Sequence, residues 1–487
     1  MKSWLTWAWV LLAGCAVPGG TGGHYAVPTE KLTAQPFSQT ATGEWQSVGG
    51  RWWEEFGDAR INEWVELAQE ANPSLRAQAQ RVLAQEALAR AVGGERGPTL
   101  DVGLDASRSF VTPVAGGDRA FTTVLRPNAQ IAWQSDLFGR LKSKERSAWA
   151  SAWASENDRL ALSHSLIATV IRLRVALSVL DRRYDLAQSV VQSRQGTLDV
   201  VEGRYGRGVE ATSAVDVRLA RENLANAQAN LPSLALERQL TRHALQELLG
   251  QQPGGPLEAG EISALPEVSA PPVGLPAGLL DRRPDLRAAN FRTQAAAGQA
   301  DVALAAMYPD LRLSASGGWD AADWEDLFDT DRLFGSLVGD LVVRLFGSGQ
   351  LDANLDAARA QLLASAHDYR GQVLNALREV EDALASERYL REQLQRVEAQ
   401  VREAQVAEGL ARDRYAKGVG QLLTVLDTER RRALAQDLVL RLQQSIWNAR
   451  IDLHLALGGD WQTESSTENT TQNTNENTSE SPTTQQP

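Results

Sequence analysis

The residue types that carry most enzyme chemistry do not cluster in this chain. Ser163-His164 has no nucleophile elbow around it, and the glycine-rich runs 19–23 and 93–94 lack the Gly-Lys-Ser/Thr ending of a phosphate-binding loop. The histidines are too dispersed to form a metal site; they are His24, His164, His243, His367 and His454. The sequence therefore predicts a protein that is not an enzyme and has no cofactor or metal.

One short phrase that combines a cation, an aromatic ring and a helix-ending glycine occurs twice. Arg204-Tyr-Gly-Arg-Gly-Val209 is echoed by Arg414-Tyr-Ala-Lys-Gly-Val419, 210 residues later. Glycine readily takes the left-handed conformation that ends a helix and reverses the chain, so both phrases are predicted to be the tips of helical hairpins. The residues predicted to form the turning ends are Arg204, Tyr205, Gly208, Val209, Gly418 and Val419.

Two long apolar series lead into these tips. From Val170 to Tyr205, and again from Val373 to Tyr415, apolar residues recur at steps of three and four. This 3.5-residue period demands a left-handed supercoil with a partner helix. Charged residues interrupt the two series at Arg194, Glu387 and Glu408. For the two glutamates, a hydrated lumen and an exposed position in an imperfect heptad are alternative explanations.

The similarity between the two halves extends well beyond the tips. Asn72–Ala77 recurs as Arg283–Ala288 at an offset of 211, and Leu137-Phe-Gly139 recurs as Leu345-Phe-Gly347 at an offset of 208. The shared order of such anchors indicates a tandem duplication. The period is far longer than that of solenoid repeats, so the chain consists of two equivalent halves and not of an array. The predicted divisions are a signal peptide at 1–14, a lipidated segment at 15–60, a first repeat at 61–255, a linker at 256–278, a second repeat at 279–460 and a disordered tail at 461–487.

Each half also contains the pattern of a β-hairpin. Apolar and polar residues alternate over 100–107, and a Gly116-Gly117 turn leads to a return run at 124–133. The second half repeats the alternation over 311–316, with a return run at 337–345. Four strands cannot close a barrel, and open strand edges do not survive in lipid. Three chains that contribute four strands each would close a twelve-stranded barrel.

The N-terminus predicts export and attachment to a membrane. Lys2 precedes an apolar stretch from Trp4 to Ala13, as in a signal peptide that is removed. Leu12-Ala-Gly-Cys15 resembles a bacterial lipobox, so Cys15, the only cysteine, is the predicted site of lipidation by acyl chains such as palmitate. No other run approaches 18 consecutive apolar residues, so no transmembrane helix is expected. The net charge of -12 argues against nucleic acid as a partner.

Several of these segments together resemble a known family. The stretches RWWEEFGDARINEWVELAQEANPSLRA at 51–77 and LLDRRPDLRAA at 279–289, with the two tip phrases, are similar to the TolC/OprM-type outer membrane efflux proteins, particularly their lipoprotein branch. The resemblance implies a mixed α and β membrane protein, in which a trimeric twelve-stranded β-barrel continues into a long periplasmic α-helical coiled-coil barrel. It implies an outer membrane channel of a tripartite efflux system for drugs or toxic compounds, with a periplasmic adaptor (membrane fusion protein) and an RND-type inner-membrane pump as partners.

The resemblance also assigns roles at the tips. In that family the tips close the periplasmic entrance through tyrosine, arginine and aspartate contacts, and they meet the adaptor. Tyr415 matches the gate-pairing tyrosine and Asp427 a constriction carboxylate, while Arg414 and Asp216 complete the predicted set. A ring of three such carboxylates would repel anions and bind cations. Thr424 stands where some relatives carry a second aspartate, and Asp216 lies one residue farther from its tip tyrosine than the family pattern expects.

Three alternatives remain open from the sequence. A lipid-anchored periplasmic coiled-coil scaffold or adaptor without a pore would explain the helices and Cys15, but not the paired amphipathic hairpins. In a second alternative, the tip residues are ordinary helix caps and Asp427 is a solvent-exposed acid without a gate role. Trp52-Trp53 is either an interfacial aromatic anchor or a packing element that holds the N-terminal segment against the helices.

Overall fold

A computed structural model describes most of the two repeats. The described residues are 20–21, 25–28, 51–111, 119–209, 212–257, 282–327, 329–347 and 349–459. The signal peptide, the lipidation site at Cys15, the Gly116-Gly117 turn, most of the linker and the tail at 461–487 lie outside them.

The chain divides into two compact units. The first, called here the sheet unit, comprises Met1–Pro28, Ala79–Asp158 and Asp285–Gln372. The second, called the tip unit, comprises Thr29–Gln78, Arg159–Pro284 and Val373–Pro487. Each unit takes segments from both halves of the sequence, so the compact units cut across the duplication.

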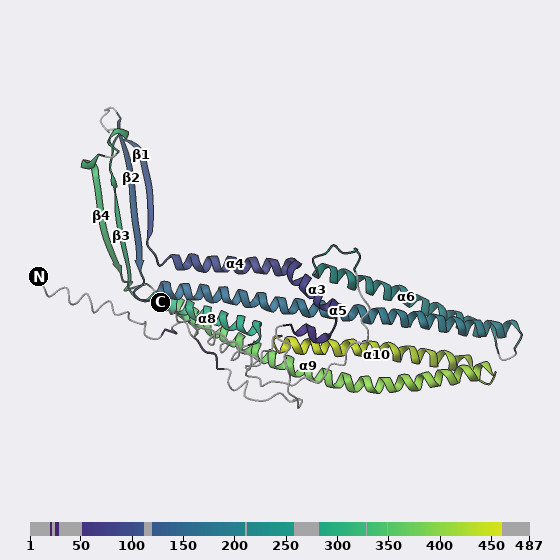
Figure 1. Ribbon diagram of the computed structural model, residues 1–487. Coiled ribbons are helices and arrows are strands. Elements are labelled where there is room, and N and C mark those ends of the chain that lie inside the picture. The colour runs from purple at the N-terminus through teal and green to yellow at the C-terminus, as the bar shows by residue number, and fades with distance from the viewer. Residues whose placement is uncertain are drawn as a thin grey trace, which may run out of the picture. The chain divides into compact units, whose positions relative to one another are not determined.

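The helices of the two halves match in length, element by element (Figure 1). Each half has a helix of 22 residues, then one of 67 and one of 35. Their bounds are α4 Pro73–Gly94 and α8 Pro284–Ala305, α5 Arg140–Gly206 and α9 Gln350–Ala416, and α6 Ala214–Leu248 and α10 Leu422–Ala456. The other described helices are η2 Trp52–Phe56, α3 Ala59–Ala71, η3 Trp324–Asp326 and η4 Thr330–Arg332. This agreement supports the tandem duplication that the sequence anchors indicate.

The structure corrects the alignment of one anchor. α5 begins at Arg140 and α9 at Gln350, so this part of the two repeats is related by an offset of 210 and not 208. The two Leu-Phe-Gly triplets therefore occupy different environments. The Phe138 ring stacks on Tyr308 with the ring centroids 5.0 Å apart, whereas Phe346 is 88% exposed.

Equivalent polar contacts tie each return helix to the start of a proline-initiated helix in the tip unit. The Asn72 side chain donates to the Leu248 carbonyl at 3.0 Å, and the Arg283 guanidinium donates to the Ala456 carbonyl at 3.2 Å. Donors and acceptors are both related by the repeat offsets. An asparagine and an arginine thus satisfy equivalent backbone carbonyls at the ends of two helices, where no intrahelical donor remains.

The strands form one antiparallel sheet in the order β1-β2-β3-β4, as Figure 1 shows. Their bounds are β1 Thr99–Val111, β2 Ala120–Ser135, β3 Asp310–Trp319 and β4 Leu333–Val342. Both predicted hairpins are present, and β2 pairs with β3 to join the two repeats. Among the described residues, the outer edges of β1 and β4 have no partner strand. The alternating apolar side chains are exposed, for example Val102 at 79%.

A buried aromatic and aliphatic cluster forms the core of the tip unit. Trp52 and Trp53 both belong to it, and Trp52 stacks on His454 with the ring centroids 5.0 Å apart. The packing explanation for the two tryptophans is therefore the one that the structure supports. One described helix, α5, is long and apolar enough to cross a membrane by length and composition alone. Its buried residues such as Ile167 and Ile171 pack in this core, which accounts for the apolar composition.

Candidate functional site

Both predicted helical tips turn as the sequence indicates. Gly208 and Gly418 have φ angles of 68° and 80°, in the left-handed region that favours glycine. The Val209 N–H donates to the Arg204 carbonyl at 3.2 Å, and the Val419 N–H donates to the Arg414 carbonyl at 3.0 Å. The two tips therefore end their long helices with the same hydrogen-bonded cap, which satisfies carbonyls that the helix leaves free.

The first tip reaches the second through one arginine and one tyrosine. Arg204 of α5 donates from its guanidinium to the backbone carbonyl of Tyr415 in α9, and its charged carbon lies 4.7 Å from the Tyr415 ring centroid. Both residues are buried, Arg204 at 7% and Tyr415 at 5% exposure. A charge-assisted hydrogen bond and a cation–π contact thus hold the two hairpins together at their ends.

The other members of the two phrases lie outside this contact. Tyr205 is 50% exposed, Arg414 and Val419 are exposed, and Val209 is half-buried. Their positions leave them accessible at the ends of the hairpins. The sequence predicted all four as tip residues but could not show which would be buried.

An apolar cluster surrounds the Arg204–Tyr415 contact and draws on both hairpins. Its residues recur at helical spacing on facing sides of four helices. They are Leu198, Val201, Val217, Ala220, Leu224, Ala411, Tyr415, Leu422 and Val425. Because burial of one large aliphatic side chain stabilises by roughly 1.5–3 kcal/mol, the cluster is a major source of cohesion between the tips.

A buried network of charges lies next to this cluster. Arg412 of α9 pairs with Glu429 of α10 at 2.8 Å and with Glu408 at 3.0 Å. The Thr197 hydroxyl of α5 donates to Glu429 at 2.6 Å, and Arg412 also donates to the Ser193 hydroxyl. Glu429 and Glu408 are only 4% and 2% exposed as side chains. The network therefore links the first hairpin to the second in a setting where an unpaired charge would be costly.

The same ion pair exists in the first repeat with its charges exchanged. Arg221 of α6 donates to Glu202 of α5 at 2.6 and 2.9 Å, and the repeat offsets map Glu202 to Arg412 and Arg221 to Glu429. In the first repeat both partners are well exposed, at 40% and 53%. All four residues can be read from the sequence, but the offsets of 210 and 208 that make the two pairs equivalent come from the helix bounds of the structure.

Asp427 lies on α10 and is held by two arginines of the same helix. Arg430 and Arg431 each donate to its carboxylate at 2.7 Å. These hydrogen bonds, the one from Arg430 first, hold the pKa of the Asp427 carboxyl below its usual range. The predicted constriction acid is therefore a compensated carboxylate and not an isolated negative charge.

Asp216 occupies the first turn of α6 and forms a capping box with Ser213. Its carboxylate accepts from the Ser213 N–H and hydroxyl at 2.8 Å each, while the Ser213 hydroxyl accepts from the Asp216 N–H. The equivalent position in α10 is Thr424, and the equivalent of Asp427 in α6 is Leu219. The two aspartates thus stand at different positions of the repeat.

Three charged residues that interrupt the apolar series all have partners inside the tip unit. Glu387 is buried and pairs with Arg450 at 2.7 Å, and Glu408 pairs with Arg432 at 2.8 Å. Arg194 donates to the Asn223 carbonyl at 2.8 Å. The two glutamates therefore face neither a hydrated lumen nor solvent, because both are buried and paired with arginines of the same subunit.

The fold and the site together define a class of protein. A sheet with an exposed apolar face and open edges, combined with two equal helical hairpins locked at their tips, is the architecture of a membrane channel subunit with a helical extension. Within the described ranges, no group of three or more His, Cys, Asp or Glu side chains is arranged to hold a metal ion.

Comparison with known proteins assigns the family. The outer membrane efflux protein family matches residues 64–251 and 275–459. The chain is 32% identical over 425 residues to the pyoverdine export outer membrane protein OpmQ of Pseudomonas putida, which covers 85% of this chain and 89% of that relative. It is 30% identical over 474 residues to the solvent efflux pump outer membrane protein SrpC of Pseudomonas putida, covering 96% and 99%.

Solved structures agree with this assignment. The outer-membrane channel OprN aligns with a TM-score of 0.82 and 28% identity, over 90% of this chain and 99% of that one. The chain therefore belongs to the outer membrane efflux protein family, and both the resemblance seen in its sequence and the predicted fold class are confirmed.

Proposed function

We propose that this chain is the outer-membrane channel of a tripartite efflux system, a passive homotrimeric conduit that exports small toxic molecules. The pyoverdine export and solvent efflux roles named for two relatives support this proposal. Three chains would close a twelve-stranded β-barrel in the outer membrane, with the helical hairpins in the periplasm. A periplasmic adaptor and an RND-type inner-membrane pump would deliver the substrate and the energy, so the chain itself needs no catalysis.

The four-stranded sheet is the observation that carries the proposal. Its apolar side chains are exposed, and within the part of the chain that the structure describes β1 and β4 end the sheet with unpaired edges. Each unpaired backbone group costs several kcal/mol in lipid, so a membrane sheet must close on itself. Copies of the same chain are the simplest source of the missing strands.

Lipidation at Cys15 completes the proposed attachment to the outer membrane. The lipobox-like segment before Cys15 supports it, and two or more acyl chains hold a protein on a bilayer stably. In the proposal the anchor fixes the chain to the membrane and has no part in the pore. Cys15→Ser is therefore expected to weaken membrane attachment before assembly but to leave single-channel conductance unchanged.

We propose that the two tips form the periplasmic gate and the adaptor contact. The buried Arg204–Tyr415 contact supports a gate role, since it is one of the contacts that join the two hairpins at their ends. The exposed Tyr205 and Val419 are suited to contact a partner, and Asp427 would supply the constriction charge.

Reconstitution of the full-length chain tests the channel. The purified protein is expected to run as a heat-resistant trimer on a gel and to give stepwise conductance in a planar lipid bilayer. A monomer that remains soluble without detergent and gives no conductance would favour the pore-free scaffold and overturn the proposal.

A second experiment separates docking from conduction. The variant Tyr205→Ala/Val419→Ala is expected to abolish export in cells while it retains the conductance of the wild-type channel. Leu240→Ala, at an exposed apolar position on α6 far along the helix from the tip, serves as a control that keeps both activities. Normal export by the double variant would show that these residues do not contact the adaptor.

A further inference from the structure

The junction between the two repeats shows how strand edges of this chain join. β2 pairs with β3 from Asn128 opposite Gly318 to Ser135 opposite Leu311. At the end of this junction, the Gln134 amide donates to both carboxylate oxygens of Asp310 at 2.6 and 2.7 Å. The second part of the return strand of one repeat, residues 128–135, thus pairs with residues 311–318 in the first strand of the next repeat.

The two repeats are related closely enough to transfer a register from one to the other. The first strands are related by an offset of 211, as are α4 and α8, and the return strands by an offset of 210, as are α5 and α9. Applied to the observed pair Leu104–Pro127 of β1 and β2, these offsets give Ala315 opposite Leu337, which is the pair observed in β3 and β4. The offsets therefore reproduce an independent register.

We propose that β4 of one chain pairs antiparallel with β1 of a second copy in the register of the internal junction. The proposal rests on the homotrimer proposed above and specifies how its subunits join. In the internal junction Gln134 stands opposite Arg312. The same offsets place Arg344 directly opposite Asp101 of the partner subunit, a pair of opposite charges. Opposite charges that face each other across an antiparallel pair are stabilising.

The side chains on both edges suit this register. Arg344 and Asp101 have no charged partner within the described part of one chain. On the apolar face, the register places Val343 opposite the partner's Val102 and Leu341 opposite the partner's Leu104. All four of these side chains are exposed in one chain. A shift by one residue would put apolar side chains opposite polar ones, because successive residues of a strand face opposite sides.

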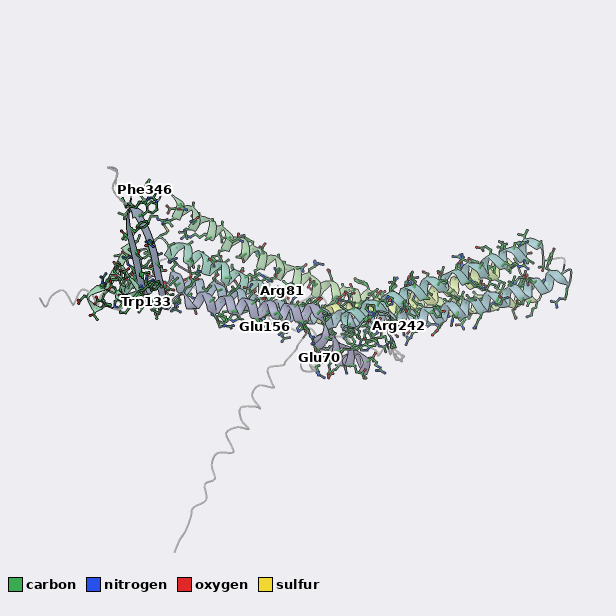
Figure 2. All side chains as sticks on the ribbon, turned by 90° about the horizontal axis from the view of Figure 1, so that it is seen from above. Glu70, Arg81, Trp133, Glu156, Arg242 and Phe346 are labelled. Carbon is green, nitrogen blue, oxygen red and sulfur yellow. The ribbon has the colours of Figure 1, made fainter. Side chains whose placement is uncertain are left out.

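The proposal also accounts for the short length of β4. Its equivalent β2 extends to Ser135, which maps to Leu345, but β4 ends at Val342. In β2 the last three residues pair with β3, whereas residues 343–345 have no strand beside them in the described ranges of a single chain. Leu345 and Phe346, at 92% and 88% exposure, follow at this edge, and Figure 2 shows Phe346 lying apart from Trp133 of β2. Pairing with a second copy would extend β4 by these three residues and cover Leu345.

One pair of like charges counts against this register. Asp340 would stand opposite the partner's Asp105 on the polar face of the sheet. Within one chain the Asn128 amide donates to Asp105 at 2.8 Å, which offsets part of that repulsion. Water on the polar face would screen the remainder.

Disulfide trapping in the full-length protein tests the register. In Val102→Cys/Val343→Cys, the two cysteines of one chain lie on opposite edges of the four-stranded sheet. Three strand spacings separate them by roughly 14 Å, whereas a disulfide needs Cα atoms about 4.4–6.8 Å apart. Any disulfide between these positions therefore joins two chains. Mild oxidation is expected to convert the protein into a covalent trimer on a non-reducing gel.

Two matched pairs serve as controls for the trapping experiment. Val102→Cys/Val342→Cys places the second thiol on the opposite face, and Val102→Cys/Leu341→Cys shifts it by two residues. Both are expected to cross-link poorly. If the chain is trimeric by native mass but one of these pairs cross-links better, the inferred register is wrong while the channel proposal stands. If no variant and no wild-type sample is trimeric, the proposed channel itself fails.

A charge exchange provides an independent readout. Arg344→Asp and Asp101→Arg are each expected to lower the temperature at which the trimer band dissociates on a gel, because each places like charges opposite one another. The double variant is expected to restore that temperature. Failure of the double variant to restore it, with the single variants folded by circular dichroism, would overturn the pairing of these two residues.

Discussion

The two helical tips carry the same phrase but bury opposite halves of it. In the first tip the arginine, Arg204, is buried and the tyrosine, Tyr205, is exposed; in the second, Tyr415 is buried and Arg414 is exposed. The two buried members meet each other. Duplication of the phrase therefore gives one contact and not two, because each copy supplies the residue that the other copy leaves exposed.

The duplicated ion pair teaches the same lesson about burial. Glu202–Arg221 and Arg412–Glu429 occupy equivalent positions, but only Glu429 is cut off from water, at 4% exposure. An exposed pair contributes little because water and salt screen it, whereas removal of one partner from a buried pair leaves a charge unsatisfied. The two repeats should therefore respond very differently to equivalent substitutions.

The largest expected effect comes from the buried pair. Arg412→Ala removes the arginine that pairs with the buried Glu429 carboxylate at 2.8 Å, and it should lower the free energy of unfolding by about 3–5 kcal/mol. The matched change Glu202→Ala in the first repeat should cost no more than about 1 kcal/mol. Denaturant unfolding of the purified variants measures both. Equal losses would contradict the distinction between a buried and an exposed copy.

A smaller effect is expected at the contact between the tips. Arg204→Ala removes a buried hydrogen bond from a charged group and should cost about 1.5–3 kcal/mol. It should also raise single-channel conductance, because the first hairpin loses one of the contacts that join it to the second. Arg414→Ala is the matched control and should leave both quantities near wild type. A conductance increase in Arg414→Ala alone would reverse the roles assigned to the two tips.

Removal of the buried Tyr415 hydroxyl should raise, and not lower, the free energy of unfolding. The Tyr415 hydroxyl has no hydrogen-bond partner among the described residues, so Tyr415→Phe should stabilise the protein by roughly 1 kcal/mol. Tyr205→Phe, at the exposed equivalent, should be neutral. Thermal unfolding measures both changes. Destabilisation by Tyr415→Phe would mean that the assembled channel supplies a partner for this hydroxyl.

The smallest effect concerns the pH dependence of Asp427. Its folded pKa is held below the ordinary value by Arg430 and Arg431, so its negative charge is present above that ordinary value and is lost only as the pH falls through the lowered pKa. Block of the reconstituted channel by divalent cations should persist into that acidic range. Arg430→Gln/Arg431→Gln should move the midpoint of block to higher pH, and Asp427→Asn should remove the titration. An unchanged midpoint in the double variant would separate block from Asp427.

The periodic parts of the sequence allowed the fold to be predicted. Apolar steps of three and four located the long helices, and Gly208 and Gly418 located the turns, because both signals depend on local geometry. The sequence could not show that Arg204 is buried while Arg414 is exposed. The helical period shows which residues share a face, but not which neighbour covers that face.

Two sequence expectations failed for related reasons. Glu387 and Glu408 suggested a hydrated surface, because a lone sequence position does not show the arginine on another helix that neutralises it. The Leu-Phe-Gly triplets suggested an offset of 208, because identical letters outweighed the two-residue shift in the chain before α9. In the first case the missing information was a contact between two helices; in the second it was the residue at which α9 begins.

The exchanged charges of the duplicated ion pair also constrain how a gene of this kind can change. A recombination that copied α9 over α5 would put the arginine of position 412 opposite Arg221, and the reverse exchange would put a glutamate opposite the buried Glu429. Either product would place like charges face to face. Transfer of one helix without its partner helix therefore costs stability in this region, most of all beside the buried Glu429.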